Sequence, residues 1–231
     1  MQIIESTAFG VRSAILRLDA NGGAPSFILF PMIHVAAPDF YAEISRRLND
    51  CDLVLCEGVK SPTASLLTLS YRFYAESPRL RLVSQKAMKL DHLKGRLIHA
   101  DVTGDAFERR WRDLKTWVRF VLPLAAPLYG LYLRHFGTRA AIARVLGTNL
   151  RKSRKAILAD ENYEKVSEVV LDWRDQRLLD VIEQQRLRHR NADLCIAVLF
   201  GARHMRAVIR HLVVKRGYRV AKAEWATVFT L

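Results

Sequence analysis

Three residues that can bind a metal ion or move a proton stand directly after apolar segments of this sequence. His34 ends Phe-Pro-Met-Ile-His, Glu57 follows Leu-Val-Leu-Cys, and His204 ends Gly-Ala-Arg-His after a long apolar run. Two imidazoles and one carboxylate are a common ligand set for a catalytic metal that keeps one coordination position open. Their residue types therefore indicate metal-assisted chemistry.

The residues before each of these groups favour a β-strand. In a mostly parallel sheet, the carboxyl ends of neighbouring strands meet at one crevice, so the three groups are expected to converge. Glu57 is the most informative, because a carboxylate is costly to bury unless it is paired, protonated or bound to a metal. Asp101 follows Leu-Ile-His-Ala and predicts a second carboxylate that supports the site from behind. Taken singly, each residue can also be a structural strand end, and only their joint occurrence favours function.

The segments that must position these residues alternate between strand and helix patterns. Residues 11–18 and 26–33 flank a loop rich in Asn, Gly and Pro, which predicts a β-hairpin. A helix begins at Pro38, with an apolar residue at every fourth position. A strand over residues 52–57 comes next, and this β-α-β order predicts a parallel pair.

Further strands are predicted at three segments: residues 96–101, 194–200 and 218–229. Between them, residues 105–185 have helical patterns nearly throughout. The helix after His204 has an apolar stripe typical of packing on a sheet. We therefore predict one α/β domain over residues 1–231, with a central mixed, mostly parallel sheet flanked by helices and an α-helical insertion at about 105–185.

Composition narrows the function classes. Half of the 231 residues are apolar, which is enough for a core and argues against disorder. Three cysteines without a repeated spacing argue against a disulfide framework and favour a reducing compartment. The net charge of +14 favours an acidic partner such as nucleic acid, an anionic membrane surface or a phosphorylated ligand.

Targeting signals are not expected. The first ten residues have no basic lead and no apolar run long enough for a secretory signal. The longest apolar stretch, residues 120–133, is shorter than the roughly 20 residues that span a bilayer, and two prolines interrupt it. We therefore expect a soluble, cytoplasmic protein that can also associate with a membrane peripherally.

The segment 120–155 combines this apolar stretch with a basic one. Residues 134–155 contain seven Lys or Arg and no acidic residue. The combination is typical of an interfacial element whose apolar groups face lipid and whose basic groups face anionic head groups. An internal helix pair with a solvated basic face remains the alternative. Nucleic-acid binding is less expected, because no known recognition motif is present, and Trp111 and Trp117 are expected in the core.

The order of these motifs resembles the TraB/PrgY/GumN family, which groups with Tiki-type metalloproteases and, more distantly, with erythromycin esterase and ChaN-like proteins. That family has an early Gly-x-x-His, an acidic residue that closes the second strand, and a late Gly-x-x-His before a helix. Here Pro31 stands in place of the first glycine. The segment Asp175-Gln176-Arg177 resembles the family's arginine-containing stretch, with Gln176 where an acid is common.

This resemblance implies a divalent-metal-dependent hydrolase, peptidase- or esterase-like, that acts on a small molecule or a peptide. Mn²⁺ or Zn²⁺ at His34, Glu57 and His204 would activate water, or Glu57 would serve as general base. Arg177 or Arg203 would stabilise an oxyanion or hold a substrate carboxylate. Two alternatives stay open: a non-catalytic protein that binds a ligand or metal compound in the same pocket, and a basic, membrane-peripheral adaptor with a vestigial site.

Overall fold

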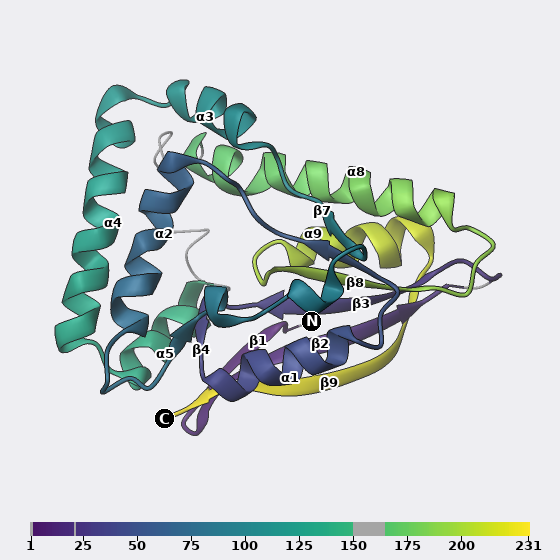
Figure 1. Cartoon of the computed structure of the whole chain (residues 1–231), viewed down its shortest axis with the longest axis horizontal. Helices are drawn as coiled ribbons and strands as arrows, with labels where there is room; N and C mark the ends of the chain where they lie inside the picture. The colour runs from purple at the N-terminus through teal and green to yellow at the C-terminus, as the bar shows by residue number, and fades with distance from the viewer. Residues whose placement is uncertain (1, 21, 150–164) are drawn as a thin grey trace.

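The computed structural model describes residues 2–20, 22–149 and 165–231. Within them one mixed sheet is formed by seven strands: β1 (Ile4–Thr7), β2 (Gly10–Asp19), β3 (Ser26–Met32), β5 (Leu53–Cys56), β7 (Leu97–His99), β8 (Cys195–Gly201) and β9 (Arg219–Thr230). Their order is β1-β2-β3-β8-β5-β7, and β9 also pairs with β2 (Figure 1). Only β2 is antiparallel to its neighbours, so the other six strands run in one direction. The predicted mostly parallel sheet is confirmed.

The order of the central strands differs from the prediction in one respect. The hairpin of β2 and β3 is present, and β3 and β5 are parallel. They are not neighbours, however, because β8 lies between them and pairs with both. The prediction of a directly paired β-α-β unit was therefore wrong. A β-α-β pattern fixes the direction of two strands, but a strand from a distant part of the chain can still insert between them.

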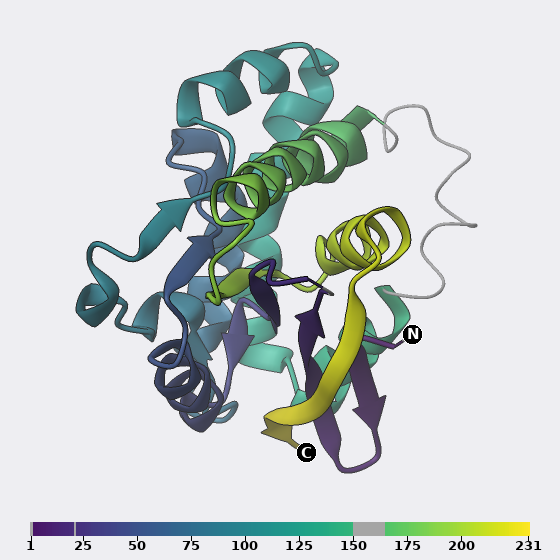
Figure 2. The same cartoon turned by 90° about the vertical axis from the view of Figure 1, so that its right-hand side faces the viewer.

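Helices cover both faces of this sheet. The described helices are α1 (Pro38–Leu48), α2 (Pro62–Ala75), α3 (Gly104–Arg112), α4 (Thr116–Phe136), α5 (Arg139–Asn149), α8 (Trp173–Arg188) and α9 (Met205–Ile209). Figure 2 shows α8 and α9 on one side of the sheet and α1 on the other. Short elements complete the described chain: the strands β4 (Val35–Ala36) and β6 (Val83–Ser84), 3₁₀ turns at Gln85–Ala87 and Asp91–Leu93, and π-helical turns at Glu168–Asp172 and Arg210–Lys215.

The alternation of side chains along β8 explains these layers. Ala197 and Leu199 belong to the core cluster that contains α1, whereas Ile196, Val198 and Phe200 belong to the cluster that contains α8 and α9. Successive residues of a strand face opposite sides of the sheet. A strand that is covered on both sides must therefore be apolar throughout, which is why β8 is such a clear signal in the sequence.

The predicted helical insertion extends too far along the chain. Its helix α8 packs on the sheet, with Leu178 and Ile182 fully buried in the core. α3 and α4 instead share a small cluster of their own around Phe107, Trp111 and Val118. Figure 1 shows α4 beside α2, away from the sheet. Only the earlier helices of the predicted range therefore stand outside the α/β core.

Two further findings concern α4. Trp111, just before it, is buried as predicted, but Trp117 is 53% exposed and its predicted place in the core was wrong. Within the described residues, no helix combines the length and the apolar character that crossing a membrane requires. The basic residues predicted at 151–155 lie outside the described part of the chain.

Candidate functional site

The carboxyl ends of β3, β8 and β5 meet at one edge of the sheet, because these strands are parallel neighbours. Glu57 directly follows β5, and His204 stands three residues after β8. The structure brings these two together: Oε1 of Glu57 lies 3.7 Å from Nε2 of His204. The predicted convergence of a carboxylate and an imidazole at this edge is therefore present.

A buried arginine that the sequence did not single out, Arg174 of α8, lies between two carboxylates of the site. Its Nη2 atom is 2.6 Å from Oε1 of Glu57 and 2.6 Å from Oδ2 of Asp101, and its Nε donates to Oδ1 of Asp101 at 2.9 Å. The side chains of Arg174 and Glu57 are 11% exposed and that of Asp101 is 1% exposed. Buried carboxylates are tolerated when they are paired and hydrogen-bonded, so Arg174 allows two of them at adjacent strand ends.

Arg177, which the resemblance implies would stabilise an oxyanion or hold a substrate carboxylate, lies three residues further along α8. Its side chain is exposed, and it forms no hydrogen bond or ion pair with the described residues. The role that the resemblance implies for Arg177 stays a prediction. Helical periodicity distinguishes Arg174 from Arg177: Arg174 lies four residues before the buried Leu178 and so on the same side of the helix, whereas Arg177 does not.

Asp101 has the supporting position that was predicted for it. Besides Arg174, it accepts hydrogen bonds from the backbone N–H of Gly58 at 3.1 Å and of Val102 at 2.8 Å. These bonds satisfy both of its oxygens and fix the loop after β5. Asp101 therefore holds Arg174 in place against Glu57.

Glu57 is held in its charged form. Burial raises the pKa of Glu57. This effect is outweighed by the charge of Arg174, by the charges of His34 and His204, and by the hydrogen bond from the Gly201 N–H, so that the pKa is lowered to about 2. The Gly201 N–H donates to Oε2 of Glu57 at 2.6 Å. At neutral pH Glu57 is therefore a hydrogen-bond acceptor, not a proton donor.

His204 is oriented by a carboxylate on the next helical position after Arg174. Its Nδ1 lies 2.6 Å from Oδ1 of Asp175, and its side chain is 4% exposed. A carboxylate beside Nδ1 favours the proton on that nitrogen, which leaves the lone pair on Nε2. Its ring also packs edge-on against Phe200. Nε2, the atom on the Glu57 side, is therefore the basic one.

His34 approaches the same site from β3. Its ring stacks on Tyr71 at 4.7 Å, and its Nδ1 lies 3.2 Å from Oε1 of Gln85. It is close enough to Glu57 for its charge to lower the pKa of that carboxyl. Pro31, where the family that the sequence resembles has a glycine, lies past the last β2–β3 pair at Leu29, and its carbonyl accepts a hydrogen bond from the Ser13 hydroxyl.

Tyr71 and Arg203 complete the polar surroundings. Burial raises the pKa of Tyr71, the charge of Glu57 raises it further, and Arg203 opposes this. The Tyr71 hydroxyl therefore keeps its proton, and it forms no hydrogen bond with the described part of the chain. Arg203 is exposed and forms no ion pair with any described residue.

The glycine of Gly-Ala-Arg-His has a steric role. A Cβ atom at Gly201 would lie 3.2 Å from Oε2 of Glu57 and 3.5 Å from Cδ2 of His204. With a Cβ at this position, the carboxylate of Glu57 would have to shift by a few tenths of an ångström. This close approach explains why a glycine ends β8.

Whether a metal ion fits between His34, Glu57 and His204 depends on their donor atoms. Both oxygens of Glu57 already accept one hydrogen bond, Oε1 from Arg174 and Oε2 from the N–H of Gly201, and each keeps a second lone pair. The residues that the structure describes contain no group of three or more His, Cys, Asp or Glu side chains arranged to hold a metal ion. In this arrangement His34, Glu57 and His204 do not form a ready metal site. A bound Mn²⁺ or Zn²⁺ stays a prediction.

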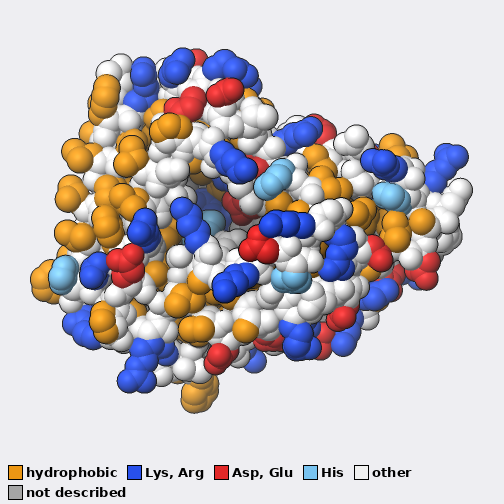
Figure 3. Space-filling view, in the orientation of Figure 1, with side chains coloured by type: hydrophobic (Ala, Val, Ile, Leu, Met, Phe, Trp, Pro, Cys, Tyr) orange, Lys and Arg blue, Asp and Glu red, His pale blue; other side chains and the backbone are white. Residues whose placement is uncertain are grey.

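Figure 3 shows that the face drawn in Figure 1 is hollowed near its centre, with basic side chains around the hollow. Two cavities lie elsewhere: one of about 390 Å³ at the end of α4, and one of about 360 Å³ beside Cys195.

Comparison of the chain with protein-family models, curated proteins and solved structures finds no match. The resemblance to the TraB/PrgY/GumN family therefore stays a prediction.

Proposed function

We propose that this protein is a hydrolase of ester or amide bonds, with His204 as the general base. The observation that supports this most is the chain of contacts from Asp175 to His204 to Glu57, at 2.6 and 3.7 Å. Asp175 holds the imidazole so that Nε2 is basic. A histidine oriented in this way at the end of a parallel strand is suited to remove a proton from a nucleophile.

The nucleophile in this proposal is water. Nε2 of His204 and Oε1 of Glu57 are 3.7 Å apart, so one water molecule can donate a hydrogen bond to each. Its lone pair then points away from both acceptors, towards a substrate carbonyl. Because Glu57 stays ionised, with a pKa of about 2, it orients the water while His204 takes the proton.

The carbonyl oxygen of the substrate requires a hydrogen-bond donor in the transition state. The Tyr71 hydroxyl is a suitable donor, because its raised pKa keeps it protonated and it forms no other hydrogen bond with described residues. His34, stacked on Tyr71 at 4.7 Å, positions that ring. Arg203 is exposed nearby and is suited to hold an anionic group of the substrate.

The test is a hydrolysis screen with p-nitrophenyl esters and fluorogenic peptide amides, on the parent protein, His204→Ala and Asp175→Asn. His92→Ala is the matched control, because His92 is exposed. We expect kcat to fall by about 10²–10⁴ in His204→Ala, the usual contribution of a general base. The kcat of Asp175→Asn should fall by at least about tenfold. Equal rates in His204→Ala and His92→Ala would contradict the proposal.

The same samples separate the alternatives. Each protein is assayed after chelation and after addition of Mn²⁺ or Zn²⁺, with its metal content measured by mass spectrometry. Activity that requires near-stoichiometric metal, lost with His34→Ala, would favour the predicted metal-dependent hydrolase. Ligands that raise the melting temperature without turnover would favour the non-catalytic binding protein.

A further inference from the structure

The helix α4 carries a long apolar face that no described part of the chain covers. The exposed fractions of Phe120, Leu124 and Leu128 are 68%, 66% and 61%, and those of Tyr132 and Phe136 are 57% and 70%. These residues recur at intervals of four, so they lie along one side of the helix. Figure 3 shows apolar side chains gathered along the edge of the molecule that α4 forms. Soluble monomers rarely expose a continuous apolar strip of this kind without using it.

The opposite side of α4 packs closely on the protein. Gly130 is buried, and a Cβ atom there would lie 2.5 Å from Cα of Ser70 in α2. Arg134 donates to Glu76, and its carbonyl accepts a hydrogen bond from Ser77. The helix is therefore anchored along one side, and its apolar face is held outward by the fold.

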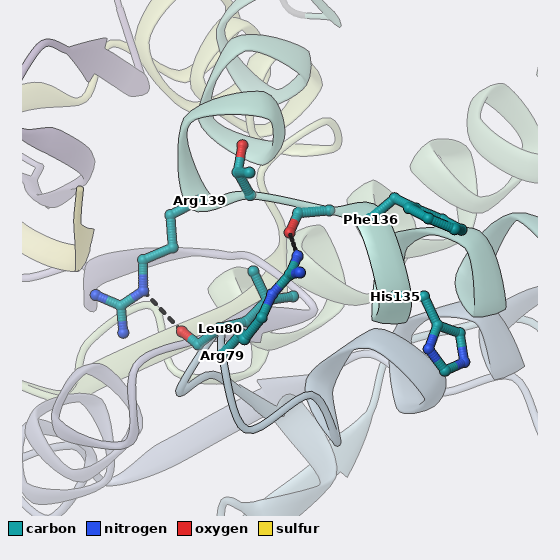
Figure 4. Close-up of a pocket in the computed structure, with 7 residues that line it drawn as sticks. Arg79, Leu80, His135, Phe136 and Arg139 are labelled. Atoms are coloured by element: carbon teal, nitrogen blue, oxygen red, sulfur yellow. Dashed lines mark hydrogen bonds between the residues drawn. The ribbon is translucent and has the colours of Figure 1, made fainter.

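Positive charges without acidic partners stand at both ends of this face. At the start, Lys115 and Arg119 form no ion pair with the described residues. At the far end, the guanidinium of Arg79 binds the carbonyl of Gly137, and that of Arg139 binds the carbonyls of Leu80, Arg81 and Thr230 (Figure 4). Carbonyl partners fix these side chains but do not neutralise their charge. α4 itself contains no Asp or Glu.

The cavity at this end of α4 joins the two features. It measures about 390 Å³ and is lined by Arg79, His135, Phe136 and Arg139, among others. Figure 4 shows Arg79 and Arg139 held on the loop side of this cavity, with Phe136 and His135 on the helix side. Cationic groups therefore border an apolar surface that continues along the helix.

We propose that α4 lies flat on an anionic lipid bilayer, with its apolar face in the acyl-chain boundary and the flanking cations at the phosphate groups. An interfacial helix of this kind binds through buried apolar area and through attraction to anionic lipids. A second copy of the chain is a poorer occupant. Whether two α4 helices pair parallel or antiparallel, each end meets like charges from Lys115, Arg119, Arg79 and Arg139. This inference does not depend on the proposed hydrolase.

The test is co-sedimentation of the full chain with phosphatidylcholine vesicles, with and without about 30% phosphatidylserine. The variant is Leu124→Glu/Leu128→Glu, and the matched control is Phe9→Ser/Val214→Ser, because Phe9 and Val214 are exposed by 86% and 75% away from α4. We expect the parent and the control to bind serine-containing vesicles in a salt-sensitive way. The α4 variant should bind at least about tenfold more weakly, through loss of apolar burial and added repulsion.

Two readouts make the outcome decisive. Circular dichroism must show the α4 variant folded, and sedimentation velocity must report the oligomeric state of each protein without lipid. Equal vesicle binding by the variant and the parent would overturn the proposal. The proposal would also be overturned if the parent formed a dimer that the variant does not form and if the parent did not bind vesicles. The apolar face of α4 would then be covered by a second copy of the chain. Trp117, 53% exposed at the start of α4, should be quenched by lipids brominated on the acyl chain only if the proposal holds.

Discussion

Nη2 of Arg174 lies 2.6 Å from Oε1 of Glu57, and this contact joins α8 to the strand end that carries the carboxylate of the site. The same nitrogen reaches Asp101. One cation thus neutralises two buried acids from neighbouring strand ends. The arrangement makes Arg174 a structural requirement of the site as well as a source of its electrostatics.

Replacement of Arg174 by Met should destabilise the protein strongly. Two carboxylates would be left buried without their cation, which typically costs about 3–5 kcal/mol. Arg177→Met is the matched control, because Arg177 is on the same helix but exposed, and it should change the unfolding free energy by less than about 0.5 kcal/mol. Urea unfolding of both variants measures the difference. Similar losses in the two variants would show that the pairing contributes little.

Stability should fall in acid in a window set by Glu57. The pKa of its carboxyl is about 2 in the folded protein and about 4.5 when exposed, so the unfolded state takes up a proton first as the pH falls. The contribution is complete above pH 4.5 and is lost progressively towards pH 2. At 1.4 kcal/mol for each pKa unit it amounts to roughly 3 kcal/mol.

The measurement is the unfolding free energy between pH 2 and 6, for the parent and for Glu57→Gln. The variant should be less stable at pH 6 but should lose less stability on acidification. Glu183, whose pKa is lowered to about 2 chiefly by a hydrogen bond from Arg186, contributes a second slope that persists in this variant. An identical pH slope in the two proteins would mean that Glu57 is not held in its charged form.

Gly201→Ala should disturb the site more than the fold. The added Cβ would lie 3.2 Å from Oε2 of Glu57, so the carboxylate must move by a few tenths of an ångström. The prediction is a fall of at least about tenfold in kcat, since a shift of the carboxylate also moves Oε1, the oxygen that orients the water in the proposed mechanism. Gly58→Ala is the control, because a Cβ there meets no atom within 4 Å. The change in kcat measures the effect on the site, and the change in melting temperature measures the effect on the fold.

Tyr71→Phe should lower kcat by about 10²-fold and change KM little, as expected when a hydrogen bond to the transition-state oxygen is lost. The ring remains, so the stacking with His34 at 4.7 Å is retained. Tyr129→Phe, on the exposed side of α4, serves as the control. Steady-state kinetics on any substrate found in the hydrolysis screen decides. Unchanged kcat would remove Tyr71 from the proposed mechanism.

Gly130→Val should separate α4 from α2. A Cβ at this position would meet the backbone of Ser70 at 2.5 Å, and backbone atoms cannot move aside as the end of a flexible side chain can. We expect a loss of about 1–3 kcal/mol. Ala125→Val, on the exposed side of the same helix, controls for the lower helix propensity of valine. Equal thermal unfolding of the two variants would show that the helices do not depend on this close contact.

Local patterns in the sequence were sufficient for six of the seven strands of the sheet, all but β1 (Ile4–Thr7), and for the strand ends at the candidate site. β8 is recognisable because it is apolar on both faces, and the helix from Pro38 is recognisable from its spacing of four. Glu57 and Asp101 stood out because a carboxylate after an apolar strand needs a partner. The sequence alone therefore determined the α/β class, the site edge and most of the acidic and imidazole groups found there.

Only the tertiary structure decided which distant residues meet them. Arg174 and Arg177 belong to the same helix and have the same chemistry, and their difference depends on how α8 is rotated against the sheet. The insertion of β8 between β3 and β5 likewise depends on long-range pairing. The exposure of α4 also depends on the tertiary structure, since an apolar helix has the same sequence pattern whether or not another element covers it. Local periodicity reports which face of an element is apolar, whereas burial and pairing depend on what packs against that face.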